Sequence, residues 1–501
     1  MTRLSDQQID LIARGLADRL GRRTTGGEAA LSATAAAAPA VASPAAAPTV
    51  GSRAATTAAL GGGVFASVDA GVAAARRAFH ELQECSLAKR TEIIAAYRAA
   101  MLAAGADLAR EAWQETGLGR LEDKVAKNRL VTEKTPGTEA LQPVAVSGDN
   151  GLTLTERAPF GVIGAITPTT NPTSTVICNT IGMVAAGNTV VFNAHPGARR
   201  CSLSTVRRLD AAAVAAGGPP NLAVAVAEPT IESAAELMRH ADIDLLVVTG
   251  GPGVVRAAMQ SGKRAICAGP GNPPVVVDET ADLAKAGRDI VFGASFDNNI
   301  ICVDEKEVFA TVTAVDLLLE SLRAAGAFIA SATELRRLES HLFKEIRGPR
   351  AHAVINKDCV GKNADFLLGL IGVRSGPEIR LIAAEVSEDH PLVWTEQLLP
   401  VLPVVRVPHV MRGIALAKEA EHGYGHSASM HSHDITALSR MAREINTSIF
   451  VKNGPIAAGL GHGGEGYTSF TIASPTGEGL TSPVSFSRLR RCVMVDHFRI
   501  V

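Results

Sequence analysis

The spacing of apolar and polar residues changes several times along the chain, and each change predicts a different kind of segment. Residues 5–20 place isoleucines and leucines three or four positions apart, which predicts a short amphipathic helix. The following stretch, 24–63, is rich in alanine, proline and glycine and holds only two charged residues. Such a composition cannot bury a core. We therefore expect residues 1–23 to form a helix carried on a flexible linker.

From residue 64 onward the pattern becomes that of an α/β protein. Helical spacing predicts helices over 69–82 and 88–117. Residues 151–161 then alternate and 162–166 are continuously apolar, as when an antiparallel edge precedes a strand buried on both faces. Helices expected at 173–186, 198–215 and 231–239 alternate with strands expected at 188–194, 222–227 and 244–250. This alternation predicts βαβ units in a doubly wound parallel sheet.

A second group of strand-like segments predicts another α/β domain. These segments are residues 273–278, 307–311, 352–356 and 402–407. The fold class we expect is therefore α/β with two doubly wound parallel-sheet domains. We assign 64–265 to the first domain, 266–450 to the second, and 451–501 to a segment that returns to the first.

Composition excludes several classes of function. The chain has 49 Lys and Arg against 50 Asp and Glu, so there is no basic field to hold a nucleic acid. Its seven cysteines lie far apart without a CxxC pair, which favours reduced thiols over a disulfide framework. The chain has no run of about 18 strongly apolar residues, the length that a membrane-spanning helix needs. We expect a soluble intracellular protein without a nucleic-acid or membrane partner.

Three predicted strands end in turns of small or polar residues that suit a ligand site. These turns are 166–172, 193–197 and 248–253, and carboxyl ends of parallel strands are where such sheets bind ligands. The chain has neither a GxGxxG fingerprint nor a Walker A loop, so a nucleotide would bind in another way. We expect no metal site, because His426, His431 and His433 lack flanking cysteine or acidic ligands.

Cys302 is the candidate nucleophile, because it follows an asparagine-rich turn just before a predicted strand. A buried, inert thiol is the alternative at this stage. Resemblance to a known family favours the nucleophile over the inert thiol. From residue 64 the chain resembles the aldehyde dehydrogenase superfamily through the motifs ETG at 115–117, TPTTNP at 167–172, TGG at 249–251, Cys302 itself and EQLLPVLPV at 396–404. It resembles the CoA-acylating members more narrowly through NPP at 272–274, SFDNN at 295–299, EKEV at 305–308 and NGP at 453–455.

The resemblance implies a role for each of ten residues. It makes Cys302 the thiolate that attacks an aldehyde, with Asn171 donating to the oxyanion. Thr170 competes for that role, because Asn171 stands one position later after Pro168 than its counterpart in hydrolytic members. The cofactor-binding residues that it implies are Thr167, His195, Thr249, Gly250, Gly251, Gly253, Glu396 and Leu398. His195 or Asn193 replaces the lysine that holds the adenosine ribose in hydrolytic members, and no arginine stands at the NAHPG turn to favour a 2′-phosphate, so NAD is expected rather than NADP.

The resemblance also separates two outcomes for the enzyme-bound thioester. Hydrolytic members carry a glutamate that activates water, and Cys267 stands at that position here. Loss of this base favours coenzyme A as acyl acceptor. We expect oxidation of propionaldehyde to acyl-CoA with NAD, reversibly, with acetaldehyde as the alternative substrate. A hydrolytic dehydrogenase and a shell-organising protein that uses the dehydrogenase body as a scaffold are the alternative functions.

The two ends of the chain predict assembly. The leading helix and linker resemble those of propionaldehyde dehydrogenases packaged in bacterial microcompartments, so 1–23 is expected to bind a shell protein inside the compartment lumen. Docking of this helix on its own domain is the alternative. Residues 140–157 and 490–498 match the family's antiparallel oligomerisation segment and imply a homodimer or homotetramer.

Overall fold

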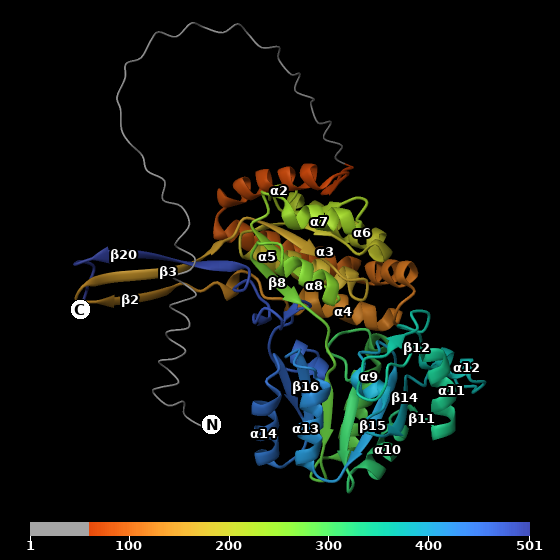
Figure 1. Cartoon of the computed structure of the whole chain (residues 1–501). Helices are drawn as coiled ribbons and strands as arrows, with labels where there is room; N and C mark the ends of the chain where they lie inside the picture. The colour runs from red at the N-terminus through yellow and green to blue at the C-terminus, as the bar shows by residue number, and fades with distance from the viewer. Residues whose placement is uncertain (1–59) are drawn as a thin grey trace, which may run out of the picture. The chain divides into compact units, whose positions relative to one another are not determined.

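A six-stranded parallel sheet forms the first lobe of the computed structural model, which describes residues 60–501 (Figure 1). The expected helix at 1–23 and nearly all of the linker lie outside the described residues. In spatial order the strands are β1 (Val64–Phe65), β6 (Ala223–Val226), β5 (Thr189–Asn193), β4 (Val162–Ile166), β7 (Leu245–Thr249) and β8 (Ala265–Ala268). The chain runs from β4 through β5 and β6 before returning to the other side of β4 as β7. This reversal places a topological switch point between β4 and β7, where open α/β sheets bind ligands.

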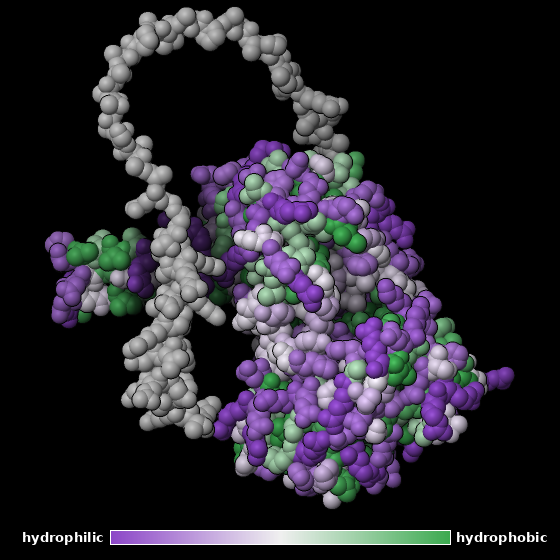
Figure 2. Space-filling model, in the orientation of Figure 1, coloured by the Kyte–Doolittle hydropathy of each residue, from purple (hydrophilic) through white to green (hydrophobic). Residues whose placement is uncertain are grey.

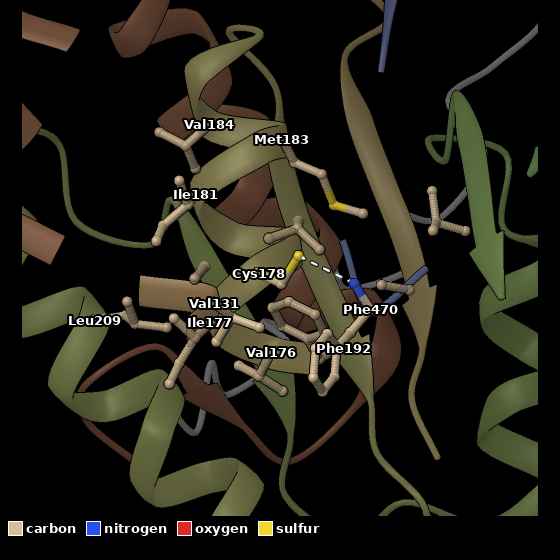
Figure 3. Close-up of a cluster of buried hydrophobic side chains, with 14 of the residues drawn as sticks. Val131, Val176, Ile177, Cys178, Ile181, Met183, Val184, Phe192, Leu209 and Phe470 are labelled. Carbon is tan, nitrogen blue, oxygen red and sulfur yellow. Dashed lines mark hydrogen bonds between the residues drawn. The ribbon is translucent and has the colours of Figure 1, made fainter. Parts of the chain in front are cut away.

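Helices cover both faces of this sheet. They are α2 (Val68–Gln83), α3 (Leu87–Thr116), α4 (Leu121–Lys134), α5 (Pro172–Ala185), α6 (Arg199–Ala215), α7 (Ile231–Arg239) and α8 (Pro252–Met259). One apolar cluster joins α3, α5 and α6 to the sheet, and another joins α2, α7 and α8 to its opposite face. Cys178 of α5 lies in the first cluster and accepts a hydrogen bond from the backbone N–H of Phe470 (Figure 3). The C-terminal segment thus returns to the core of the first lobe.

A seven-stranded parallel sheet forms the second lobe. In spatial order its strands are β11 (Ala327–Ile329), β14 (Leu381–Val386), β15 (Val401–Val407), β10 (Glu307–Thr311), β9 (Pro274–Val277), β16 (Ser427–His431) and β17 (Ile449–Lys452). Its faces are covered by α9 (Leu283–Ser295), α10 (Val315–Ala324), α11 (Ala332–Leu342), α12 (Ala364–Leu370), α13 (Val410–Ala420) and α14 (Ile435–Ile445).

One expected strand of this sheet was wrong. Of residues 352–356, only β13 (Val354–Ile355) is extended, and it pairs antiparallel with β12 (Phe343–Glu345) in a separate two-stranded sheet. The parallel sheet contains β14 instead, which lies between β11 and β15 and whose first four residues are fully buried. The apolar residues of β14 gain more burial in the parallel sheet than the half-buried residues of β13 would, which explains why β14 is the strand found there.

A three-stranded antiparallel sheet projects from the first lobe (Figure 1). It consists of β2 (Val144–Gly148), β3 (Gly151–Pro159) and β20 (Ser487–Val495), with β3 in the middle. Apolar side chains are exposed on this projection (Figure 2), namely Val144, Val146, Leu489, Val493, Met494 and Val495. A pair of two-residue strands, β18 (Ile472–Ala473) and β19 (Gly479–Leu480), completes the C-terminal segment. Within 60–501, no helix combines the length and apolar character needed to cross a membrane.

Candidate active site

A cavity of about 720 Å³ lies at the carboxyl ends of β4, β5 and β7, facing the second lobe. Its volume is typical of a small-molecule or cofactor site. All ten residues singled out in the sequence line it: Thr167, Asn171, His195, Thr249, Gly250, Gly251, Gly253, Cys302, Glu396 and Leu398. The structure therefore brings together three strand-end turns, the cysteine turn and the EQLLPV segment, which are separated by up to about 230 residues of sequence.

The first lobe contributes a wall suited to a dinucleotide. Thr167, directly after β4, has a buried Oγ1 with no hydrogen-bond partner among residues 60–501. The turn after β7 is open: an added Cβ would meet nothing within 4 Å at Gly251 or Gly253. The N-terminus of α8 follows at Pro252, and such ends attract phosphate groups. These features fit a bound dinucleotide.

Asn193 and His195, at the end of β5, have different surroundings. The side chain of Asn193 is engaged, since its Oδ1 accepts from Ser233 Oγ at 2.6 Å and its Nδ2 donates to the Thr230 carbonyl at 3.4 Å. Among the described residues, the exposed ring of His195 forms one hydrogen bond, in which Nδ1 accepts the Gly197 N–H at 3.0 Å. His195 is thus the residue of this turn with a ring nitrogen still available to a ligand.

The turn before Cys302 is built from three consecutive left-handed residues. Asp297, Asn298 and Asn299 have φ values of 46°, 56° and 66°. Asn and Asp adopt this conformation more readily than other side chains that carry a Cβ, which explains the asparagine-rich motif. Buried hydrogen bonds hold each of the two amides: Asn298 Nδ2 donates to the Gly361 carbonyl at 2.9 Å, and Asn299 Nδ2 donates to the Ala294 carbonyl at 2.8 Å. The turn is therefore rigidly supported.

Lys306 closes the back of this turn. Its fully buried ammonium donates to the Asn299 carbonyl at 2.8 Å, to Asn299 Oδ1 and to the Ile301 carbonyl at 3.3 Å. These acceptors lie immediately before Cys302 in the chain. Lys306 therefore fixes the backbone that presents the thiol to the cavity.

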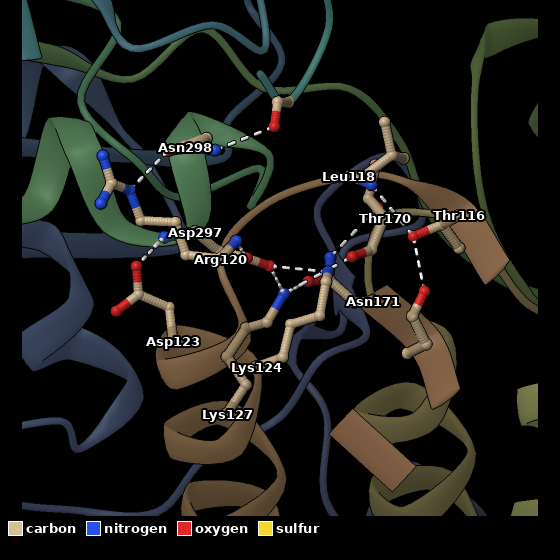
Figure 4. Close-up of polar contacts among 12 residues, drawn as sticks. Thr116, Leu118, Arg120, Asp123, Lys124, Lys127, Thr170, Asn171, Asp297 and Asn298 are labelled. Carbon is tan, nitrogen blue, oxygen red and sulfur yellow. Dashed lines mark hydrogen bonds and ion pairs between the residues drawn. The ribbon is translucent and has the colours of Figure 1, made fainter. Parts of the chain in front are cut away.

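Asn171 lies just before α5, at the junction with the cysteine turn (Figure 4). Its Oδ1 accepts a hydrogen bond from the Lys127 ammonium at 2.6 Å, and its Nδ2 donates to Thr170 Oγ1 at 3.2 Å. Lys127 and Lys124, both on α4, also pair with the buried carboxylate of Asp297. Burial would raise the pKa of Asp297, but the two ammonium groups hold it below its usual value. Burial lowers the pKa of Lys127 to about 8.

Comparison with known proteins identifies the family. The model of the aldehyde dehydrogenase family matches residues 40–475. The chain belongs to the aldehyde dehydrogenase family. Both the expected membership and the expected α/β fold are thereby confirmed.

Several relatives of this family member are close. The acetylating acetaldehyde dehydrogenase EutE of Escherichia coli is 51% identical over 440 residues, covering 88% of this chain and 94% of the relative. The structure of Rhodopseudomonas palustris propionaldehyde dehydrogenase with bound propionyl-CoA is 50% identical with a TM-score of 0.84, covering 87% and 95%. A propionaldehyde dehydrogenase from the fucose utilisation microcompartment of Clostridium phytofermentans is 46% identical with a TM-score of 0.85, covering 88% and 100%.

Within this family member, the surroundings of Cys302 disfavour the thiolate form of its side chain. Burial and the negative charges of Glu396 and Asp304 together raise the pKa of this thiol to about 12, although the Lys306 ammonium lowers it. The pKa of Glu396 is itself raised by burial, and its Oε1 accepts the Gly271 N–H at 3.4 Å. Glu396 is thus half-buried in the same cavity as the Cys302 thiol.

We predict that alkylation of Cys302 by iodoacetamide accelerates about tenfold per pH unit from about pH 7 to about pH 9, because only the thiolate reacts and its fraction rises with pH below the pKa. Glu396→Gln removes a negative charge, lowers the pKa of the thiol and speeds labelling at fixed pH. Lys306→Met has the opposite effect. Peptide mass spectrometry measures the rates, and a rate independent of pH over this range would show that the thiolate is already formed.

Cys267 lies apart from the cavity that contains Cys302. It lies on β8, is fully buried in the apolar cluster beneath α2 and α8, and does not line the cavity. Burial raises the pKa of its thiol to about 11. Among the described residues that line the cavity, Cys302 is the one cysteine and Glu396 the one carboxylate.

The three histidines of the GHSASMHSHD segment do not converge. His426 and His431 are buried on or beside β16, whereas His433 is exposed beyond its end. Over the described part of the chain, no group of three or more histidine, cysteine or acidic side chains is arranged to hold a metal ion.

Proposed function

We propose that this protein is a CoA-acylating aldehyde dehydrogenase, which converts a short aldehyde, NAD⁺ and CoA into acyl-CoA and NADH, reversibly. The observation that carries the proposal is that Cys302 lines a cavity with no carboxylate at the position of the hydrolytic base, where Cys267 is buried instead. The names of the relatives, acetylating and propionyl-CoA-binding, agree with it.

The residues of the site divide the chemistry between them. The Cys302 thiolate attacks the aldehyde carbonyl, and the Asn171 amide together with the Cys302 backbone N–H donates to the oxyanion that forms. Bound NAD⁺ supplies the hydride acceptor. The CoA sulfur then attacks the acyl carbon of the resulting thioester, the bond from that carbon to the Cys302 sulfur breaks, and acyl-CoA leaves with the Cys302 thiol regenerated. Because Cys267 and not a carboxylate occupies the position of the hydrolytic base, the thioester survives until CoA arrives.

The cofactor is held by the two halves of the cavity. In the proposal Thr167, Thr249 and the N-terminus of α8 bind the dinucleotide phosphates, with Gly250, Gly251 and Gly253 allowing close approach. Glu396 binds the hydroxyls of the nicotinamide ribose, and Leu398 packs beside it. Leu398 has a φ of 53°, and such left-handed non-glycine residues cluster at functional sites. His195 would contact the adenosine ribose, and no arginine stands at the NAHPG turn to hold a 2′-phosphate, so NAD is favoured.

Propionaldehyde is the first substrate and acetaldehyde the alternative. The 50% identical structure is a propionaldehyde dehydrogenase, whereas the 51% identical relative is an acetaldehyde dehydrogenase. Comparison of kcat/KM for the two aldehydes at saturating NAD⁺ and CoA decides between them.

The function is tested by following NADH formation with and without CoA. We expect sustained NADH production with an aldehyde only when CoA is present, because water attack on the thioester is about 10²–10⁴-fold slower without a general base. Equal rates with and without CoA would identify the hydrolytic alternative. No NADH in either case would favour the shell-organising alternative.

We propose further that residues 1–23 direct the enzyme into the lumen of a bacterial microcompartment by binding a shell protein. The amphipathic pattern at 5–20 supports this, as does the microcompartment origin of the Clostridium relative. The site residues all lie within 60–501, so deletion of 1–23 is predicted to leave kcat and melting temperature unchanged while abolishing co-purification with shells. Ile12→Glu with Leu16→Glu gives the same result. A truncated enzyme that loses activity, or still enters shells, would contradict the assignment.

The projecting sheet is proposed to join subunits into a dimer or tetramer. Its exposed valines and leucine form an apolar surface of the kind that subunit interfaces cover. The molar mass measured by light scattering checks the prediction.

A further inference from the structure

Lys127 reaches the proposed oxyanion site from a helix that the mechanism does not otherwise use. It lies on α4, is 2% exposed, and its ammonium contacts Asn171 Oδ1 at 2.6 Å and the Asp297 carboxylate. The Thr170 carbonyl lies at 3.4 Å from the same nitrogen. In Figure 4 the side chain of Lys127 points from α4 toward Asn171 and Asp297, between the proposed oxyanion amide and the cysteine turn.

We infer that Lys127 is a positioning residue that orients the Asn171 amide for the oxyanion. An ammonium group is a donor only, so the atom of the amide that faces it must be the oxygen Oδ1. The NH₂ group is then forced to the other side. One of its two N–H bonds is directed to Thr170 Oγ1 at 3.2 Å, and the second has no partner among residues 60–501. Since Asn171 lines the cavity, this second N–H is the donor that serves the oxyanion.

The amide also contacts Thr170, the other candidate for the oxyanion role. Thr170 Oγ1 accepts from the amide, and so it supports the orientation that Lys127 imposes. Without Lys127 the amide could rotate by half a turn, because its oxygen and nitrogen have nearly the same shape. The oxygen would then face the developing negative charge and oppose it.

Asp297 keeps the ammonium in place. It lies in the left-handed turn that leads to Cys302 and is fully buried, and its carboxylate binds both Lys127 and Lys124. Lys127 therefore links the oxyanion amide to the segment that carries the nucleophile, across 44 residues to Asn171 and 170 residues to Asp297. This inference rests on the proposed role of Asn171.

The test compares Lys127→Met, Asn171→Ala and the double variant in steady-state acyl-CoA formation. We expect each single variant to lower kcat/KM by about 10²–10³-fold, the loss typical of one oxyanion donor. The double variant should be no worse than Asn171→Ala, because Lys127 acts through the amide. Fully multiplicative losses would overturn the inference. If Asn171→Ala keeps full activity, the proposed role of Asn171 fails instead.

Lys124→Met is the matched control, since Lys124 lies one turn away on α4 and binds the same carboxylate at 3.0 Å without contacting Asn171. Its loss of kcat/KM should stay within a few-fold, and a loss equal to that of Lys127→Met would assign the effect to the ion pairs alone.

Alkylation of Cys302 by iodoacetamide forms no oxyanion, so Lys127→Met should be labelled at the wild-type rate. Slow labelling would indicate a disordered turn and contradict the inference. If Lys127→Met fails to fold, Lys127→Gln replaces it in the test, because glutamine keeps an N–H donor. Lys127→Gln should show an intermediate loss of kcat/KM that disappears in the Asn171→Ala background. Persistence of that loss would overturn the inference.

Discussion

Replacement of Cys302 by alanine abolishes acyl-CoA formation, lowering it by about 10⁴-fold or more, while NAD binding and melting temperature stay near the wild-type values. The reason is that no other cysteine lines the cavity within the described chain, and the thioester requires a sulfur at this position. Acyl-CoA assays measure the loss, and calorimetric titration with NAD⁺ checks the cofactor site.

Cys267→Ala is the matched control for this prediction. The Cys267 thiol is fully buried in an apolar cluster, so its removal costs about 1 kcal/mol of stability and leaves most of the activity. Substantial turnover by Cys302→Ala, or inactivity of Cys267→Ala in a folded protein, would reverse the assignment of the nucleophile.

Asp297→Asn destabilises the protein by about 3–5 kcal/mol, because it leaves two buried ammonium groups without their counter-charge. Asparagine keeps the shape of the side chain and tolerates the left-handed backbone, where φ is 46°. The substitution therefore isolates the charge. A melting temperature lower by roughly 5 °C or more is expected, together with loss of activity as the cysteine turn and Lys127 move.

The control for Asp297→Asn is an exposed ion pair. Asp316 is paired with Arg406 at 2.6 Å, and its side chain is 75% exposed. Asp316→Asn should leave the melting temperature near the wild-type value, because water screens and replaces a surface pair. If Asp297→Asn proved as mild as Asp316→Asn, the buried network would carry no charge that matters to the fold.

The apolar runs of the chain predicted the core strands well, because β4 and β5 are buried on both faces and need little but apolar residues. The sequence did not predict β14 or β16, whose segments LIAAEV and SASMH are rich in small residues of low strand propensity. They are strands because the sheet buries and pairs them. Helix α4 was missed for a related reason, since part of its buried face is charged.

The site residues likewise divide into those that the sequence predicted and those that it did not. Short motifs such as TPTTNP and TGGPG identified the cavity wall, because each is a strand end with its turn and needs only local sequence to be recognised. Lys127 and Lys306 were not found. Lysine is ordinarily exposed, and the burial of Lys127 depends on Asp297, a residue 170 positions away. Only the folded chain shows that these charges converge.

A covalent thioester at Cys302 that passes its acyl group to CoA is the central step of the proposed function. Intact-protein and peptide mass spectrometry of the enzyme mixed with NAD⁺ and propionaldehyde, without CoA, tests this directly. We predict one acyl group per subunit on Cys302, formed with one equivalent of NADH and removed as acyl-CoA when CoA is added. Continuous NADH production without CoA, or an acyl group on any other residue, would contradict it.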